Sequence, residues 1–354
     1  MSQGSLRIGI VGAGQVTRTR HIPGFQAIPG VELVAVCNSR RETTVRVARE
    51  FGIPKPYGNW EELVHDPEID AVVIGAWPYL HCPLTLAALD AGKHILTQAR
   101  MAMNAREAQR MLDRSREAAG QVAMIVPSPY GLAGEAFVRS LIADGYLGTL
   151  RELHVDSLNG DLADPDTPMS WRQQTRFSGF NMLTVGIVYE TVLRWIAPAS
   201  RVLAYASKAI GERFDPVSGK TTRVGTPDSV QVLTTQQDGS QGVYRFSGVL
   251  WHERSMSVAM YGADGTLIYD LLRDEIRGAR RGEALHPLPI PDELRGGWNV
   301  EADFVASIRG ERPVTHTDFR TGVHYMQFTE AVARSSRHQT PVTLPLQEFS
   351  NPSL

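Results

Sequence analysis

A glycine-rich turn near the N-terminus has the residue types and the spacing of a dinucleotide-binding fingerprint. The strand-like run Arg7–Val11 leads into Gly12-Ala13-Gly14-Gln15-Val16-Thr17, where a helix-like run begins. The first glycine permits a tight turn, the second lets the backbone approach a pyrophosphate, and the helix start stabilises its charge. Because Thr17 replaces the third glycine, the motif alone is a weak signal, and a turn without a ligand is the alternative. Together with the surrounding strand and helix patterns, it predicts cofactor binding by Gly12, Gly14, Gln15 and Val16.

The residues after the second strand-like run, Glu32–Cys37, indicate the type of dinucleotide. An NAD site normally places Asp or Glu there to bind the ribose 2′-hydroxyl, but this chain has Asn38, Ser39, Arg40 and Arg41. A carboxylate repels a 2′-phosphate, whereas Ser and Arg donate hydrogen bonds to it. We therefore expect these four residues to bind NADP, with NAD as the alternative cofactor. The competing interpretation is that the two arginines only begin a solvated helix.

These motifs need a parallel sheet to position them, and residues 6 to about 125 have the required pattern. Short apolar, β-branched runs alternate there with longer helix-like stretches, which is typical of βαβ units. The predicted strands are Arg7–Val11, Glu32–Cys37, Ala71–Gly75, His94–Thr97 and Val122–Val126. We predict an N-terminal Rossmann domain, with a doubly wound parallel sheet, over residues 1–126.

Residues 127–354 have a different pattern and predict a second domain. After one more helix, Glu135–Ala143, alternating apolar and polar residues dominate from Leu150 onward, and turn signals separate the strands. Further helices are expected at about 184–196, 298–308 and 318–336. The predicted fold class is thus α/β, with a C-terminal α+β domain built on a large, mostly antiparallel or mixed sheet.

Composition and charge exclude several classes of protein. A length of 354 residues suits two domains, and a net charge of −2 provides no field to bind a nucleic acid. No apolar run is long enough for a bilayer, so no membrane partner is expected. Cys37 and Cys82 form no CxxC pair and the histidines show no ligand spacing, so no metal is expected. A strand beginning at Leu6 leaves no room for a signal peptide, which predicts a cytoplasmic protein.

Further short motifs are distributed along essentially the whole chain. They are Gly12-Ala13-Gly14, His21-Ile22-Pro23, Val36-Cys37-Asn38, Ala71-Val72-Val73-Ile74 with Pro78 and His81, Ala91-Gly92-Lys93-His94-Ile95-Leu96, Leu147-Gly148, Trp171-Arg172, and Gly262 to Gly265 before Thr266 and Leu267. With these motifs the chain resembles the Gfo/Idh/MocA family of oxidoreductases. The resemblance implies a nicotinamide cofactor and a sugar, cyclitol or polyol-like substrate. It also implies a homodimer or a homotetramer.

The chain lacks the catalytic set that the resemblance implies, so we expect an atypical member. The family follows the fifth strand with Glu-Lys-Pro, whose lysine lies near the nicotinamide and the substrate, but here Gln98-Ala99-Arg100 stands there. The family's Asp and His, four residues apart on a helix, correspond to Thr184 and Val188. A positioned base contributes roughly 10²- to 10⁴-fold to alcohol oxidation, and alanine and valine cannot act as one. A non-standard acid/base set is the expectation.

Three residues are candidates for the missing chemistry. Tyr189 would act as an acid or base if a cation lowered its pKa, Arg100 would bind an anionic group, and Gln98 adjoins the lost lysine position. A core tyrosine and a surface arginine are the competing interpretations. Other residues are expected to touch a ligand, namely Ala76, Trp77, Pro78, His81 and Gln98 for the cofactor, and Trp171, Arg172, Asn181 and Thr184 for the substrate.

The function predicted from these features is that of an NAD(P)-dependent oxidoreductase acting on a sugar, cyclitol or polyol-like small molecule. One alternative is a lyase or hydrolase that uses the bound cofactor transiently or structurally. The other is a catalytically inactive, dinucleotide-binding regulatory subunit. Glu152, His154 and Asp156 share one face of the first strand of the second domain, which favours an oligomer interface or solvent over the substrate cleft.

Overall fold

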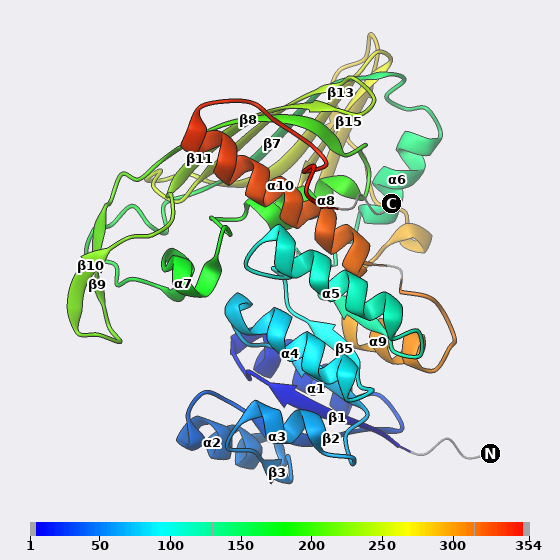
Figure 1. Ribbon diagram of the computed structural model, residues 1–354. Coiled ribbons are helices and arrows are strands. Elements are labelled where there is room, and N and C mark those ends of the chain that lie inside the picture. The colour runs from blue at the N-terminus through cyan, green and yellow to red at the C-terminus, as the bar shows by residue number, and fades with distance from the viewer. Residues whose placement is uncertain (1–4, 129–130, 315, 350–354) are drawn as a thin grey trace. The chain divides into compact units, whose positions relative to one another are not determined.

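The chain folds into two compact units, whose elements are labelled in Figure 1. A computed structural model describes residues 5–128, 131–314 and 316–349. Within these ranges, unit 1 comprises the residues up to Pro127 together with Asn299–Val323. Unit 2 comprises Ser128–Trp298 together with the residues from His324 onward.

The described part of unit 1 contains a six-stranded parallel sheet with the strand order β3-β2-β1-β4-β5-β6. The strands are β1 (Leu6–Val11), β2 (Val31–Cys37), β3 (Lys55–Pro56), β4 (Ala71–Ile74), β5 (His94–Thr97) and β6 (Ala123–Ile125). All four residues of β4 are buried, as expected for a parallel strand that is covered on both faces. This sheet confirms the predicted Rossmann fold.

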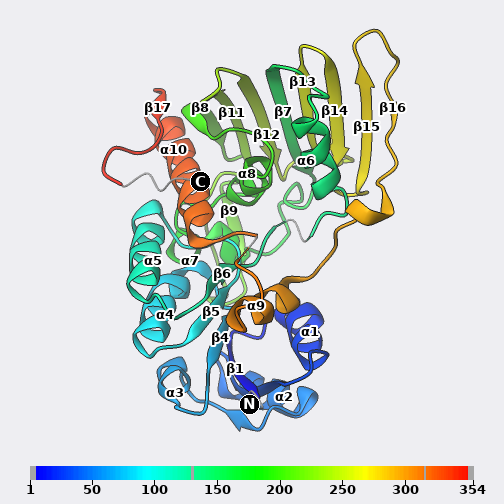
Figure 2. The ribbon, with the colours of Figure 1, turned by 90° about the vertical axis from the view of Figure 1, so that its right-hand side faces the viewer.

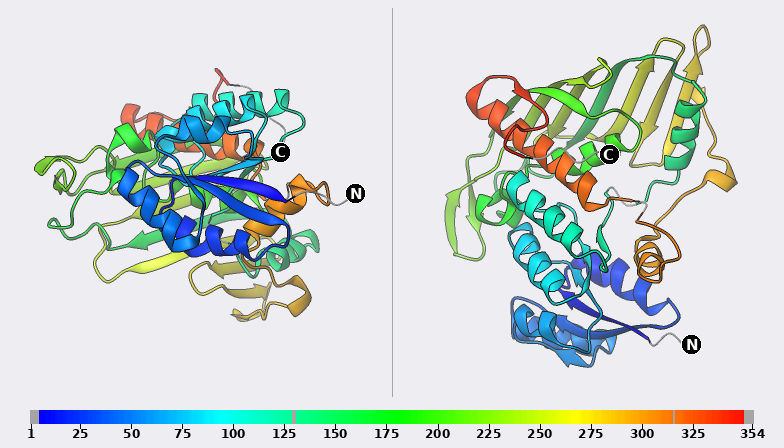
Figure 3. Two further views of the ribbon diagram at one scale, coloured as in Figure 1. Left: turned by 90° about the horizontal axis from the view of Figure 1, so that it is seen from below. Right: turned by 45° about the vertical axis from the view of Figure 1, so that its right-hand side comes forward.

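Helices cover both faces of this sheet. They are α1 (Ile22–Gln26), α2 (Arg41–Phe51), α3 (Trp60–His65), α4 (Pro78–Asp90), α5 (Ala105–Glu117) and α9 (Val300–Ile308). Figures 2 and 3 show α3, α4 and α5 on one face and α1 and α2 on the other. Asn59 and Asn104 begin α3 and α5, because their side chains accept hydrogen bonds from the backbone N–H of Glu62 and Glu107.

Unit 1 includes a segment from the C-terminal part of the chain. The sequence predicts residues 127–354 as one domain, whereas Asn299–Val323 packs in unit 1. Phe304 of α9 contacts Phe25 of α1 edge to face, with ring centroids 6.3 Å apart, and Thr317 accepts a backbone hydrogen bond from Ile125. These contacts join residues far apart in sequence, which a local pattern does not predict.

Unit 2 is built on a mixed sheet, nine-stranded in its described part, with the order β16-β15-β14-β13-β7-β12-β11-β8-β17. The strands are β7 (Leu150–Asn159), β8 (Ala199–Ser207), β11 (Ser229–Gln236), β12 (Gln241–Ser247), β13 (Arg254–Gly262), β14 (Gly265–Asp270), β15 (Glu275–Arg280), β16 (His286–Pro287) and β17 (Val342–Thr343). Strand β7 pairs parallel with β12 and antiparallel with β13. A separate hairpin joins β9 (Glu212–Asp215) to β10 (Lys220–Arg223). The large mixed sheet confirms the predicted α+β class.

Besides the short α7 (Thr175–Ser178), the described part of unit 2 has three longer helices, which lie on one face of its large sheet, as Figures 1 and 2 show. They are α6 (Glu135–Ala143), α8 (Val185–Leu193) and α10 (Phe319–His338), the last of which begins in unit 1. On the central strands, buried residues alternate with exposed ones, so one side of the sheet packs on the helices. The opposite side includes exposed apolar residues such as Leu233.

The described residues were also compared with the requirements for a membrane-spanning helix and for a metal site. In that part of the chain, no helix has the length and apolar character needed to cross a bilayer. No group of three or more His, Cys, Asp or Glu side chains there is arranged to hold a metal ion.

Candidate dinucleotide site

The glycine-rich turn lies where β1 ends, pressed against the end of β4. Gly12 has φ +90°, and a side chain there would collide with the backbone of Gly75 and Ala76. The Asn38 side chain accepts a 2.7 Å hydrogen bond from the backbone N–H of Ala13, which ties the turn to the end of β2. A Cβ added to Gly14 would meet no atom within 4 Å, so the backbone there is open to a ligand. The turn thus has the geometry that a pyrophosphate needs.

A hollow of about 510 Å³ begins at this turn. From β1 and its turn it is lined by Val11, Gly12, Ala13, Gly14 and Arg18. From the β2 side it is lined by Cys37, Asn38, Ser39, Arg40, Thr43, Arg46, Val47, Gly58, Asn59 and Trp60, and from the β4 side by Gly75, Ala76, Trp77, Tyr79 and Leu80. It therefore runs along the carboxyl ends of three neighbouring strands, where Rossmann folds bind dinucleotides.

The charged side chains that line this hollow are all positive in the described residues. None of its described lining residues is Asp or Glu, and three are arginines. Arg18 forms an ion pair with Glu50 at 2.7 Å, whereas no described residue pairs with Arg40 or Arg46. The Asn38 side chain uses its oxygen on Ala13, so its amino group is the end left to face a ligand. Hydrogen-bond donors thus dominate beside the end of β2, which is where Rossmann folds hold the adenosine ribose.

Some predicted cofactor residues lie at this hollow and others do not. Gly12, Gly14, Asn38, Ser39, Arg40, Ala76 and Trp77 line it. Arg41 instead faces a second hollow on the outer side of α2, and Gln15, Val16 and Pro78 do not line the first. Thr43 and Arg46 also line the hollow but were not predicted. Thr43 is three residues after Arg40 and Arg46 is three residues after Thr43, and this spacing is the signal that places them on one helical face.

His81 connects the ends of β4 and β5. Its ring is fully buried, with Nε2 2.9 Å from the Ala76 carbonyl oxygen and Nδ1 2.8 Å from that of Arg100. Burial lowers the pKa of His81 below its ordinary value, since no charged partner offsets the lost solvation. The ring therefore orients the two loops and does not face a substrate.

Gln98 directly follows β5 and contacts a buried carboxylate–imidazole pair. Its Nε2 lies 2.5 Å from His21 Nε2, and His21 Nδ1 lies 2.5 Å from Glu301 Oε1. His21 and Glu301 are buried, whereas Gln98 is half-buried. In the sequence, His21 stands out only as part of the motif His21-Ile22-Pro23, and no pattern links it to Glu301. Ala99 at the lost lysine position is half-buried, and Arg100 is buried instead of lying on the surface.

Tyr189 does not have the environment that its predicted acid/base role requires. It is 2% exposed, stacks on Phe328 at 3.6 Å between ring centroids, and accepts a hydrogen bond from the Ala199 N–H. Burial raises the pKa of Tyr189 further above the ordinary value, because the surroundings do not solvate a charged phenolate. The competing interpretation, a core tyrosine, describes this residue.

The predicted substrate residues lie in unit 2 between β7 and α8. Thr184 donates a 2.8 Å hydrogen bond to the Ser157 hydroxyl, and Val188, one turn along α8, is fully buried. Asn181 is buried and donates to the Ser178 carbonyl. Trp171 and Arg172 form a cation–π contact in the short helix η2 (Trp171–Gln173), with the guanidinium 4.5 Å from the ring centroid. No titratable side chain occupies the positions of the family's Asp and His.

Two comparisons with protein families decide the assignment. Residues 6–125 match the oxidoreductase family GFO_IDH_MocA, NAD-binding Rossmann fold, and residues 136–268 match the GFO/IDH/MocA C-terminal domain. The chain belongs to the Gfo/Idh/MocA family. This confirms the resemblance read from the sequence. As a member of Gfo/Idh/MocA, the protein is an oxidoreductase whose first unit takes a nicotinamide dinucleotide.

The similarity to curated relatives and to solved structures covers most of this Gfo/Idh/MocA chain. The levoglucosan dehydrogenase of Pseudarthrobacter phenanthrenivorans is 25% identical over 96% of this chain and 98% of its own. The trans-1,2-dihydrobenzene-1,2-diol dehydrogenase of Mus musculus is 29% identical over 69% of this chain and 68% of its own. A structure of levoglucosan dehydrogenase with NADH and L-sorbose has the same fold, with a TM-score of 0.83, 21% identity, and coverage of 96% and 99%.

Proposed function

We propose that this protein is an NADP-dependent oxidoreductase that acts on a hydroxyl group of a sugar, cyclitol or polyol-like molecule. The observation that carries the choice of NADP is the hollow beside β2. Ser39, Thr43, Arg40 and Arg46 offer donors there, and no described lining residue carries a carboxylate. A phosphate on the ribose 2′-position gains charge-assisted hydrogen bonds from such a lining, whereas an NAD site needs an acceptor for the 2′-hydroxyl.

The substrate class rests on the relatives and on the polar residues of unit 2. The two curated relatives are named for dehydrogenation of levoglucosan and of a dihydrodiol. Thr184, Ser157, Trp171 and Arg172 are polar or aromatic, and such side chains suit a hydroxyl-rich ring. A bound nicotinamide supplies the hydride acceptor or donor, and the chain supplies binding and orientation. The proton leaves by a route that differs from the family's, because Ala99 and Val188 carry no titratable group.

The cofactor choice predicts a specific loss of affinity in the variant Arg40→Ala. We expect the dissociation constant for NADPH to rise about 10- to 100-fold, because a charge-assisted hydrogen bond is lost, while that for NADH changes little. Fluorescence titration of wild type and variant with both reduced cofactors measures this. Arg49→Ala is the matched control, since Arg49 lies on the same helix without lining the hollow and its loss leaves both constants near wild type. Tighter binding of NADH than NADPH by the wild type contradicts the choice of NADP.

Turnover tests the reaction itself. Purified protein with NADP⁺ and a panel of polyols, anhydrosugars and cyclitols is expected to produce the absorbance of reduced nicotinamide. Product formed without any net change in the cofactor assigns the lyase or hydrolase alternative. Cofactor binding without turnover of any substrate, in either direction, supports the regulatory alternative.

We further propose that the open face of the unit 2 sheet pairs with a second copy of the chain. Leu203, Leu233 and Val243 lie side by side on β8, β11 and β12, and all three side chains are exposed. His154 of β7 continues the row beside Val243. A contiguous apolar row on a sheet face is typical of a protein interface. The row includes His154, which with Glu152 and Asp156 is predicted from the sequence to face an oligomer interface or solvent and not the substrate cleft.

A charge in the centre of this row is expected to separate the subunits. Leu233→Arg places two like charges across a two-fold interface and desolvates them, so the variant is expected to be a monomer. Light scattering during size-exclusion chromatography measures the molar mass of the wild type and variant. Val217→Arg is the control, because Val217 is exposed in the β9–β10 hairpin and is not part of the row. A monomeric wild type, or an unchanged mass for Leu233→Arg, contradicts the proposal.

A further inference from the structure

We propose that Glu301 and His21 form a buried relay that fixes the Gln98 amide, so that its oxygen accepts a hydrogen bond from the nicotinamide carboxamide. Gln98 would then be the contact residue, and the other two would be positioning residues. The inference rests on the proposed function in one respect, because it requires a nicotinamide dinucleotide in unit 1. It adds a nicotinamide contact that compensates in part for the missing family lysine.

Hydrogen-bond chemistry sets the direction of the relay. A carboxylate is only an acceptor, so Glu301 Oε1, 2.5 Å from His21 Nδ1, requires a proton on that nitrogen. In the neutral ring, Nε2 is then an acceptor. Gln98 must therefore turn its amino group toward His21, which is the arrangement observed, with 2.5 Å between the two Nε2 atoms. The Gln98 oxygen consequently points away from His21, and no described residue donates to it.

The elements around the relay hold it in place. The Gln98 backbone N–H donates to Ile74 at the end of β4, so the residue is fixed between two central strands. His21 ends the π-helical segment η1 (Thr17–His21), and such wide turns are frequent at functional sites. Gly24 in α1 leaves the room that the Glu301 side chain occupies. A Cβ at Gly24 would lie 2.8 Å from the Glu301 carboxyl carbon.

The order of the sheet places the nicotinamide at Gln98. The donors for the ribose phosphate follow β2, and the glycine-rich turn follows β1. A dinucleotide whose pyrophosphate lies at β1 extends its other half over the next strands in the sheet, which are β4 and β5. Gln98 is the first residue after β5 and is half-buried, so its oxygen faces this half of the site. The carboxamide of nicotinamide carries the N–H groups that such an acceptor would bind.

The test measures how much the nicotinamide ring contributes to binding, separately from the rest of the cofactor. Dissociation constants are measured for NADPH and for 2′-phospho-ADP-ribose, which lacks only the nicotinamide ring, and likewise for NADH and ADP-ribose. Gln98→Leu is expected to weaken NADPH binding about tenfold and to leave 2′-phospho-ADP-ribose within about twofold of wild type. Glu301→Gln is expected to act in the same direction, because an amide also donates to His21 and no longer forces its tautomer. The double variant with Gln98→Leu and Glu301→Gln is expected to weaken NADPH binding by a smaller factor than the product of the factors for the two single variants.

Controls keep this outcome distinct from misfolding and from failure of the proposed function. Gln109→Leu on α5 makes the same chemical change away from the carboxyl ends of the strands and is expected to change neither constant. Equal losses for the nicotinamide and ring-free ligands, or no loss in Gln98→Leu, overturn the relay while cofactor binding stands. A wild type that binds neither ligand of either pair overturns both proposals. NMR of protein labelled with ¹⁵N-histidine tests the tautomer of His21, whose signal is identified by its loss in His21→Asn. We expect the Nδ1–H tautomer. Observation of the Nε2–H tautomer would contradict the relay.

Discussion

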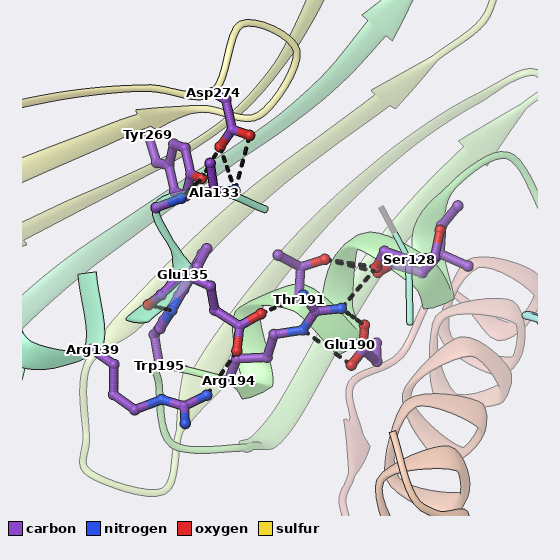
Figure 4. A network of polar contacts seen from close by, with 12 residues as sticks. Ser128, Ala133, Glu135, Arg139, Glu190, Thr191, Arg194, Trp195, Tyr269 and Asp274 are labelled. Atoms are coloured by element: carbon purple, nitrogen blue, oxygen red, sulfur yellow. Dashed lines mark hydrogen bonds and ion pairs between the residues drawn. The ribbon is translucent and has the colours of Figure 1, made fainter. Parts of the chain in front are cut away.

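Replacing Arg194 by methionine is expected to reduce the free energy of unfolding by about 3–5 kcal/mol, because it removes the buried guanidinium that two buried carboxylates share. Arg194 lies 2.9 Å from Glu135 and 2.6 Å from Glu190, and these three side chains are only 5%, 8% and 4% exposed. Figure 4 shows the guanidinium between the two carboxylates, which come from α6 and α8. Burial alone lowers the pKa of Arg194, but the two carboxylates outweigh it and raise that pKa. Urea denaturation followed by circular dichroism measures the change.

Arg139 supplies the matched control for this variant. It also pairs with Glu135, at 2.8 Å, but its side chain is 58% exposed. An exposed ion pair contributes about 0–1 kcal/mol, so Arg139→Met is expected to stay within that range. Similar losses of unfolding free energy in the two variants would contradict the prediction that the buried ion pairs contribute more to stability than the exposed one. The same network holds the start of unit 2, since Arg194 and Thr191 donate to the Ser128 carbonyl oxygen.

Replacing Gly12 by alanine is expected to abolish measurable dinucleotide binding and to cost about 3 kcal/mol of stability. The backbone at φ +90° disfavours any side chain, and a Cβ would lie 2.6 Å from the Gly75 carbonyl carbon and 2.7 Å from Ala76 Cα. Since both are backbone atoms at the end of β4, they cannot rotate away as a side chain would. Thermal unfolding and NADPH titration of the same preparation measure both effects.

Gly14→Ala is expected to separate binding from stability. The added methyl group meets nothing within 4 Å, so the fold is expected to keep its melting temperature. It would, however, occupy the space into which a pyrophosphate comes, and we expect NADPH binding to weaken by about tenfold or more. A loss of melting temperature in Gly14→Ala, or normal cofactor binding in Gly12→Ala, contradicts this description of the turn.

The parts of this protein that local patterns determine were predictable from the sequence. Buried parallel strands are continuous apolar runs, so β5 was predicted with its observed bounds and β1 to within one residue. The glycine-rich turn and the donors after β2 follow from short-range geometry, and they lie together in the structure. In unit 2, helix α6 was predicted with its observed bounds because its apolar residues recur at helical spacing.

The parts that depend on distant contacts were not predictable in this way. Glu301 and His21 are 280 residues apart in sequence, and a single sequence contains no signal for such a pair. Tyr189 carries the same hydroxyl whether it faces a substrate or a core, and only its packing on Phe328 decides between them. The sequence of strand β15 carries little signal of its own, because Gly278 and its charged neighbours weaken the alternating pattern.

The return of Asn299–Val323 to unit 1 affects the order in which the protein is made. A ribosome releases all six Rossmann strands long before it has synthesised Glu301 and Phe304, which follow nearly the whole of unit 2. Until then, the nascent first unit lacks the carboxylate that faces His21 and the ring that packs on Phe25. Domains generally fold as units and N-terminal first during synthesis. Here the first unit is completed only near the end of translation, so a chain cut short in unit 2 would lack part of its own first unit.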